Sequence, residues 1–337
     1  MILFCYGTRP EYIKIAPVLK HMARDVKTFC TGQHTGSMVP KGDFNLFIDE
    51  RHKNRLDYIV KTVMDNTIIP WEEIKLIVVQ GDTTSALAIA LSAFHHQVPI
   101  AHIEAGLRTY NNQDPYPEEA NRAAIARVTD IHLCPTKTAR ENLVAERCGG
   151  FMDVVGNPVL DHLVDLKPTI GKTILITMHR RENHPRIHEW MTAIDEVARL
   201  NPKCNFLFPV HPNPIIQSAV KVLKHVVTIF PLIHDEFLQI LTAGRMVITD
   251  SGGVQEEAAF LKKFCIVARE TTERTEGLDE VSFLSTPDTL ADKTSWLLDK
   301  PWPEDYECPY GNGKSGLRIA TLLNQYQSLL GTGPSVP

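Results

Sequence analysis

Polar residues capable of chemistry gather in this chain at the points where apolar stretches end. Six such segments are present: GTRPE at 7–11, GDTT at 81–84, EAG at 104–106, HRREN at 179–183, PVHPNP at 209–214 and DSGGVQEE at 250–257. In an open parallel α/β sheet, ligands bind outside the carboxyl ends of the strands. Because these segments occur in both halves of the chain, they predict an enzyme with one shared cleft.

The DSGG segment has the composition of an anion-binding turn. It is predicted to lie between a strand ending at Thr249 and a helix beginning near Val254, so that backbone N–H groups at the helix N-terminus could bind phosphate. The N–H donors would come from Ser251, Gly252 and Gly253. An ordinary serine cap with two turn glycines is the alternative. Four cationic residues elsewhere favour phosphate: Arg9, Lys14, Arg180 and Arg274. Neither a Walker A loop nor a GxGxxG segment is present, which argues against nucleotide hydrolysis and dinucleotide redox chemistry.

Three carboxylates in the first half suit proton transfer at carbon. Asp82, Glu104 and Glu118 are each expected in or just after a loop at a strand end, and Pro117 would set the turn that delivers Glu118. Crowding and partial burial can raise the pKa of a carboxyl group toward neutrality, which suits a general acid or base. Taken singly, Asp82 could instead cap the helix that begins at Thr84.

The second half supplies imidazoles and a further acid. His179 and His211 each end a predicted strand, and Arg180 follows the first of them, which favours phosphate contact or acid–base work. Glu257, on the helix after DSGG, is expected to face the cleft and accept hydrogen bonds from sugar hydroxyl groups. Glu256 points about 100° away from it and is expected to lie on a solvated helix face.

Composition limits the remaining classes. A chain of 337 residues with 43% hydrophobic content predicts two domains. A net charge of −5 without a long basic run argues against a nucleic-acid or membrane partner. The seven cysteines show no metal-like spacing and are read as buried thiols of a cytoplasmic protein, with no metal site. No apolar run approaches the roughly 20 residues of a membrane span.

Short strands alternate with helical periods along the chain. Strands are predicted at 2–6, 75–80, 98–103, 131–134, 173–177, 205–209, 226–230, 246–249 and 264–268, and helices near 11–23, 84–94, 187–199, 235–243, 253–262 and 314–330. This alternation predicts two Rossmann-like, doubly wound α/β domains facing a central cleft. The domains are expected at 1–168 and 169–315, followed by a segment, 316–337, whose helix packs back on the first domain before a flexible tail.

The motifs together carry a family resemblance. GTRPE, GDTT, HIEAGLRT, PYPEEANR, GNPVLD, TMHRREN, PVHPNP, DSGGVQEE, TTER and PYGNG, in this order over residues 1 to about 325, resemble the non-hydrolysing UDP-N-acetylglucosamine 2-epimerases. The resemblance implies a glycosyltransferase-B-like fold, a homodimer, and UDP bound between the domains. It also implies interconversion of UDP-N-acetylglucosamine and UDP-N-acetylmannosamine without metal or nicotinamide, by elimination and re-addition of UDP through 2-acetamidoglucal.

The resemblance also implies roles for single residues. Asp82, Glu104 and Glu118 would transfer protons and face the developing positive charge, and His179 would contact the diphosphate or assist its departure. Positions that hold UDP and its phosphates match Arg9, Lys14, His211, Ser251, Gly252 and Gly253. Phe237 matches a uracil-packing position, Glu257 a ribose contact and Arg274 the TTER arginine, while Arg122 and Arg180 join the substrate-binding set.

Several alternatives stay open from the sequence. A hydrolysing 2-epimerase would release N-acetylmannosamine and UDP, although the GTRPE motif resembles that of the non-hydrolysing branch. A UDP-sugar glycosyltransferase of the same fold, or a non-catalytic nucleotide-sugar sensor, would share the phosphate segments. The stretch between Gly32 and Lys75 is shorter than the family pattern, and its altered 33–38 segment predicts an enzyme without allosteric activation by substrate.

Overall fold

The computed structural model describes residues 1–23, 25–34, 39–49 and 52–326 and divides into two compact units. Unit 1 comprises Met1–His162 and the chain from Tyr310 onward, and unit 2 comprises Leu163–Pro309. The predicted flexible tail, and residues 35–38 of the shortened segment, lie outside the described residues.

Unit 1 is built on a seven-stranded sheet in the described part of the chain, with the order β3-β2-β1-β4-β5-β6-β7 and parallel pairing throughout. Its strands are β1 (Ile2–Tyr6), β2 (Val26–Cys30), β3 (Phe44–Asn45), β4 (Leu76–Gln80), β5 (Ile100–Ile103), β6 (Ile131–Cys134) and β7 (Phe151–Val154). Its α-helices are α1 (Arg9–Leu19), α2 (Arg55–Met64), α3 (Thr84–His95), α4 (Glu118–Val128), α5 (Lys137–Ala145) and α11 (Ser315–Asn324).

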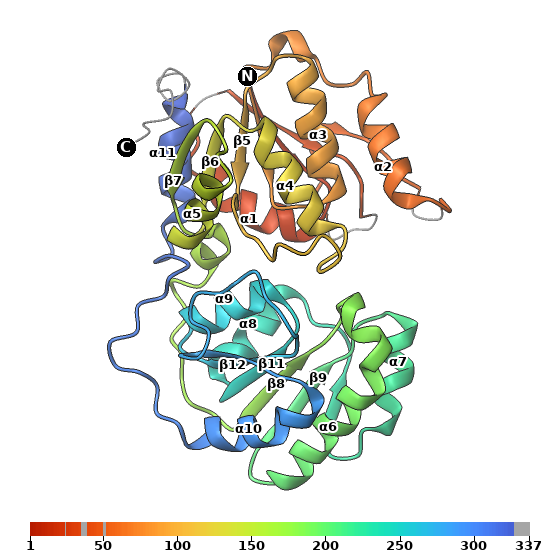
Figure 1. Cartoon of the computed structure of the whole chain (residues 1–337), viewed down its shortest axis with the longest axis vertical. Coiled ribbons are helices and arrows are strands. Elements are labelled where there is room, and N and C mark those ends of the chain that lie inside the picture. Colours follow the sequence, from red (N-terminus) through yellow and green to blue (C-terminus); the bar gives the residue numbers. More distant parts are fainter. Residues whose placement is uncertain (24, 35–38, 50–51, 327–337) are drawn as a thin grey trace. The chain divides into compact units, whose positions relative to one another are not determined.

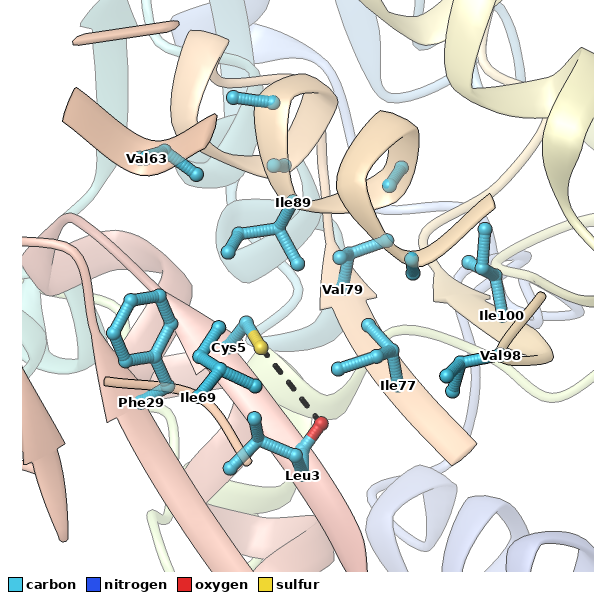
Figure 2. Close-up of a cluster of buried hydrophobic side chains, with 14 of the residues drawn as sticks. Leu3, Cys5, Phe29, Val63, Ile69, Ile77, Val79, Ile89, Val98 and Ile100 are labelled. Atoms are coloured by element: carbon cyan, nitrogen blue, oxygen red, sulfur yellow. Dashed lines mark hydrogen bonds between the residues drawn. The ribbon is translucent and has the colours of Figure 1, made fainter. Parts of the chain in front are cut away.

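Apolar layers cover both faces of this sheet. One core joins Leu3, Ile77 and Val79 of the strands to helices α2 and α3, and Figure 2 shows Ile89 of α3 directed at these strand residues. The second core joins the opposite side chains of the strands to α1 and α11, which pack on each other. Strands buried on both faces read as continuous apolar runs, which is why they are recognisable in the sequence.

Threonine caps three of the helices of unit 1. Thr8, Thr83 and Thr136 each accept a backbone N–H from the first turn of α1, α3 or α5. Because Thr83 is the cap of α3, the alternative interpretation of Asp82 as that cap is wrong.

Unit 2 contains a six-stranded sheet among the described residues, again parallel, in the order β10-β9-β8-β11-β12-β13. Its strands are β8 (Thr173–Thr177), β9 (Asn205–Pro209), β10 (Val227–Ile229), β11 (Met246–Thr249), β12 (Phe264–Val267) and β13 (Ser282–Leu284). Its α-helices are α6 (Ile187–Leu200), α7 (Pro214–Ala219), α8 (His234–Ala243), α9 (Gly252–Phe260) and α10 (Leu290–Asp299). Figure 1 shows α6 beside α7 and α10, and the contacts of α8 and α9 are with β8, β11 and β12.

The doubly wound α/β prediction is confirmed in each unit. Five strands have the predicted bounds: β1, β6, β8, β9 and β11. The last helix was predicted to run to residue 330, but α11 ends at Asn324, and residues 327–330 lie outside the described ranges. Asp161 fixes the start of α11 by accepting the N–H groups of Ser315 and Gly316, at 2.9 and 2.7 Å. None of the helices in the described ranges has the length and apolar character that crossing a membrane requires.

Candidate active site

The polar segments follow the strands at which each sheet reverses its winding. In unit 1 the order reverses between β1 and β4, so GTRPE and GDTT extend from neighbouring strands. In unit 2 it reverses between β8 and β11, which are followed by HRREN and DSGG. Connections leave in opposite directions at such a point and open a crevice there, where α/β proteins bind ligands.

Glu104 lies at the centre of a buried polar network in unit 1. It follows β5 with a positive φ of 68°, and its Oε2 accepts from Lys14 Nζ at 2.5 Å and from the side-chain amide of Gln80. Its Oε1 accepts from Asn157 Nδ2 at 3.0 Å. The structure thus brings Lys14 of α1 to the carboxylate, and it adds two amides that the sequence reasoning did not select.

Asp82 is held by Arg122 of α4. The guanidinium nitrogen Nη2 lies 2.5 Å from Asp82 Oδ2, and Nη1 lies 3.1 Å from Glu119 Oε2. Arg122 and Glu119 are buried, whereas the Asp82 side chain remains 29% exposed. Asn121 also donates to the Asp82 carbonyl, at 2.8 Å. Arg122, predicted to bind substrate, therefore orients a predicted catalytic acid in this structure.

Glu118 is the first residue of α4, directly after Pro117. It lies four residues before Arg122, and residues spaced by four share one face of a helix. Since Arg122 on that face reaches Asp82, half-buried Glu118 is on the side of α4 that carries the Asp82 contact.

Glu11, the last residue of the GTRPE segment, accepts hydrogen bonds from the start of the same segment. Buried Glu11 accepts from Gly7 N, Thr8 N and Thr8 Oγ1 at 3.0, 2.7 and 2.7 Å, and from Thr83 Oγ1 of the GDTT segment at 2.8 Å. Burial raises the pKa of the Glu11 carboxyl group, and these hydrogen bonds oppose the rise. The T-x-x-E capping spacing could have revealed this residue. Arg9, predicted to bind UDP, is the first residue of the helix thus anchored.

His102 of β5 forms a hydrogen bond to the backbone of the GDTT turn. Its Nε2 donates to the carbonyl of Gly81 at 2.7 Å, and burial lowers its pKa to about 4. A neutral imidazole therefore holds the backbone from which Asp82 projects.

His179 and His211 form a pair in unit 2. Their rings stack with centroids 5.6 Å apart, and both side chains are exposed. His211 Nδ1 accepts from Asn213 N at 3.2 Å, which leaves Nε2 to carry the hydrogen of the neutral ring. Partial burial lowers the pKa of His211. The neighbouring His179 lowers it further, by a smaller amount. The pair can thus offer an N–H donor to an anion.

Arg180 is surrounded by acids. Burial by itself would lower the pKa of its guanidinium group, but the carboxylates of Glu273, Glu182 and Asp250 raise it above the ordinary value. A cation of this kind is suited to binding phosphate at the end of β8.

The DSGG turn provides the N-terminus of helix α9, as predicted. Gly252 and Gly253 begin α9, where backbone N–H groups lack intrahelical acceptors. The Ser251 N–H donates to Thr249 Oγ1 at 3.0 Å, and its contact with phosphate stays a prediction. The Ser251 side chain makes no capping hydrogen bond.

Arg274 covers the same turn. An added Cβ at Gly252 would lie 2.7 Å from Arg274 Nη1, so only glycine leaves room for the guanidinium group. Arg274 Nε lies 2.9 Å from Glu256 Oε1, and Nη1 pairs with Glu273. Glu256 is fully buried, so its predicted place on a solvated helix face is wrong: the loop carrying Arg274 folds over it.

Glu257 and Phe237 lie on the two helices that flank this turn. Glu257 is buried on α9 and its Oε1 lies 2.8 Å from Nε2 of His234, the first residue of α8. Phe237 is half-buried one turn further along α8. Sequence reasoning missed His234 because no local pattern marks a contact between two helices.

The structure therefore groups the predicted site residues into two sets. Unit 1 carries Arg9, Lys14, Asp82, Glu104, Glu118 and Arg122, and unit 2 carries His179, Arg180, His211, Phe237, Ser251, Gly252, Gly253, Glu257 and Arg274. The first set contains three carboxylates and three cations, whereas cations, imidazoles and N–H donors dominate the second. Among the described residues, no cluster of three or more His, Cys, Asp or Glu side chains could hold a metal ion.

Known proteins are similar to this chain in sequence and fold. The model of the UDP-N-acetylglucosamine 2-epimerase family matches residues 18–324. A UDP-N-acetylglucosamine 2-epimerase of Campylobacter jejuni is 34% identical over 96% of this chain and 97% of its own length. Among solved structures, a putative UDP-N-acetylglucosamine 2-epimerase of Listeria monocytogenes has a TM-score of 0.88 and 31% identity, covering 98% of this chain and 97% of its own.

A second solved structure is that of the Neisseria meningitidis UDP-GlcNAc 2-epimerase bound to UDP-GlcNAc. It has a TM-score of 0.85 and 31% identity and covers 96% of this chain and 99% of its own. The expected glycosyltransferase-B-like class, with two Rossmann-like domains, is confirmed. With this match over nearly its whole length, the chain belongs to the UDP-N-acetylglucosamine 2-epimerase family.

Proposed function

We propose that this protein interconverts UDP-N-acetylglucosamine and UDP-N-acetylmannosamine without hydrolysing either. The observation that carries the proposal is the group of three acids in unit 1, Asp82, Glu104 and Glu118, each supported by a buried partner or a helix start. Epimerisation at carbon 2 requires proton transfer on both faces of that carbon, so a site with more than one acid–base group suits it.

The reaction would proceed by elimination followed by addition. One carboxylate of the set removes the carbon-bound proton at C2 as the bond from C1 to the UDP oxygen breaks, and the electron pair forms the C1–C2 double bond of 2-acetamidoglucal. A second acid then delivers a proton to the opposite face of C2, and the UDP oxygen bonds again to C1. The carboxylates also face the positive charge that develops at the ring.

The groups of unit 2 would hold the leaving diphosphate. The first-turn N–H groups of Gly252 and Gly253 and the Arg180 guanidinium group are suited to phosphate oxygens. His179 would contact the diphosphate, with Glu257 on the ribose and Phe237 against the uracil. Such fixed donors stabilise a departing anion without reorganising at the moment of reaction.

Proton NMR in deuterated water tests the proposal. The purified protein is incubated with UDP-N-acetylglucosamine, in parallel with Glu104→Gln and with Glu141→Gln, which changes an exposed acid of α5 in the same unit. We expect UDP-N-acetylmannosamine carrying deuterium at C2 from the wild type and from Glu141→Gln. Glu104→Gln is expected to lose about 100-fold or more in rate.

Other products would contradict the proposal in recognisable ways. Free N-acetylmannosamine together with UDP would indicate a hydrolysing 2-epimerase. UDP release that depends on an added acceptor would indicate a glycosyltransferase. UDP binding without turnover or exchange would indicate a sensor.

We also propose a cytoplasmic homodimer. Seven cysteines outside any disulfide, five of them buried, are typical of a reducing compartment. Light scattering after gel filtration is expected to give twice the chain mass of 37.9 kDa. A monomeric mass at working concentration would contradict the proposed dimer. Recovery of the protein outside the cytoplasm would contradict the proposed location.

A further inference from the structure

Asp250 occupies the strand end next to the HRREN loop. Parallel pairing of β11 with β8 brings Thr249 level with Thr177, so the residues that follow the two strands start side by side. Asp250 is fully buried there. A carboxylate that is shielded from solvent must accept its hydrogen bonds from protein donors. Those donors show which segments the carboxylate keeps in position.

Three N–H groups converge on one oxygen of this carboxylate. Asp250 Oδ2 accepts from His179 N at 2.9 Å, Arg180 N at 2.8 Å and Asn183 Nδ2 at 3.1 Å. Asn183 also donates to the Ala268 carbonyl at 2.9 Å, which joins the loop to the end of β12. The backbone of His179 and Arg180 is therefore fixed by a single side chain.

The other oxygen faces the His179 ring. Asp250 Oδ1 lies 3.4 Å from His179 Nδ1 and 3.2 Å from its backbone N. An imidazole nitrogen facing a carboxylate carries the hydrogen, which puts the lone pair of the neutral ring on Nε2. Asp250 thus determines which nitrogen of His179 can accept a proton and, once protonated, donate to the diphosphate.

We propose that Asp250 is a positioning residue that sets the orientation and tautomer of His179 during departure and return of UDP; this inference rests on the proposed function. The logic is that of an acid orienting a catalytic imidazole, arranged here across the point at which the unit 2 sheet reverses. Asparagine cannot replace it, because one amide oxygen cannot serve three N–H donors and the imidazole together.

A double-mutant cycle separates positioning from general support of the fold. Turnover is measured for wild type, Asp250→Asn, His179→Asn and the double variant. We expect Asp250→Asn to lower kcat about 30-fold or more in the wild type but less than about 3-fold in the His179→Asn background. Similar losses in both backgrounds would overturn the proposal, since a merely structural carboxylate acts whether or not His179 is present.

Unit 2 offers a matched control. Asp195 accepts the N–H groups of Lys224 and His225, both at 2.7 Å, and lies 3.0 Å from His225 Nδ1. It reproduces the carboxylate–imidazole arrangement outside the proposed site. Asp195→Asn is expected to leave kcat unchanged, and an equal loss there would mean that any such anchor matters.

Long-range proton–nitrogen NMR of the imidazoles gives a readout that does not depend on turnover. The His179 signals, assigned by their absence from His179→Asn, should show the hydrogen on Nδ1 in the wild type and on Nε2 in Asp250→Asn. A wild-type ring with its hydrogen on Nε2 would overturn the proposal.

A milder variant keeps the proposal testable if Asp250→Asn does not fold. Asn183→Ala removes one donor from Oδ2 and keeps the carboxylate, and its loss of kcat should also vanish in the His179→Asn background. The proposed function fails separately, when the wild type itself forms no UDP-N-acetylmannosamine.

Discussion

The ammonium nitrogen of Lys14 lies 2.5 Å from Oε2 of Glu104, although 90 residues separate them in the chain. Lys14 comes from the helix after β1 and Glu104 from the end of β5. An ion pair this close connects the residue predicted to bind phosphate with a residue predicted to transfer protons. A diphosphate that attracts Lys14 would thereby alter the surroundings of Glu104.

Replacing Lys14 by methionine should impair proton transfer as well as binding. Glu104 would lose the ammonium group of Lys14 and keep the neutral amides of Gln80 and Asn157. A hydrogen bond to a charged group contributes about 1.5–3 kcal/mol, so kcat/KM should fall roughly 10- to 100-fold. Lys27→Met, at an exposed ion pair with Asp43, is the control and should have no effect. An unchanged rate of deuterium entry at saturating substrate would contradict this prediction.

Arg122→Met should destabilise unit 1 as well as slow the reaction. It leaves buried Glu119 without its guanidinium partner and releases Asp82. Removing one partner of a buried ion pair costs about 3–5 kcal/mol. Urea unfolding measures this loss, and Arg199→Met, at an exposed pair with Glu196, should leave the midpoint unchanged. Equal stability of the two variants would show that the Arg122 pairs contribute little.

Two adjacent glycines should respond oppositely to alanine. A Cβ at Gly252 would meet the Arg274 guanidinium group, which Glu256 and Glu273 hold in place, whereas a Cβ at Gly253 meets nothing within 4 Å. Gly252→Ala should cost about 1–3 kcal/mol by overpacking and weaken UDP binding. Gly253→Ala should gain about 0.5–1 kcal/mol because alanine is the better helix former. Calorimetry of unfolding and of UDP binding measures both, and the same sign for the two variants would refute the steric argument.

Stability of the β5–β6 region should fall below neutral pH. His102 and His132 are paired on these strands, and burial lowers the pKa of each to about 4. The unfolded chain binds these protons near pH 6.5, so the stability conferred by the neutral rings is complete above about pH 6.5 and is lost as pH falls toward about 4. Each ring removes up to about 1.4 kcal/mol per pH unit in this window.

Hydrogen exchange of peptides covering β5 and β6, across that pH window, tests the effect. His132→Gln should reduce the slope, and His225→Gln, an exposed histidine of unit 2, should not. A slope that His132→Gln leaves intact would assign the acid sensitivity to other groups.

Most of the strands, and the polar segments after them, were predictable because their determinants are local, whereas β2, β3, β7 and β13 were not predicted. Continuous apolar runs such as Ile2–Tyr6 mark strands buried on both faces, and the polar residue after each run marks its carboxyl end. Helix α4 was not predicted, because its first residue, Glu118, follows a proline-rich turn that reads as a loop.

The prediction for Glu256 failed for a different reason. Helical spacing places it away from Glu257, but whether that side meets water depends on the loop that carries Arg274. The supporting residues Gln80, Asn157 and Asp250 were missed similarly, since each contacts a site residue far away in the chain.

The sequence by itself therefore determined the α/β class, the family and the residue types of the site, since periodicity and short motifs are properties of neighbouring residues. Only the tertiary structure decided which of those residues meet. Lys14 reaches Glu104, Arg122 reaches Asp82, and Asp250 reaches His179 because the order and register of parallel strands bring distant segments together. Contact energies act through space, and a buried charge is identified only when the groups that enclose it are in place.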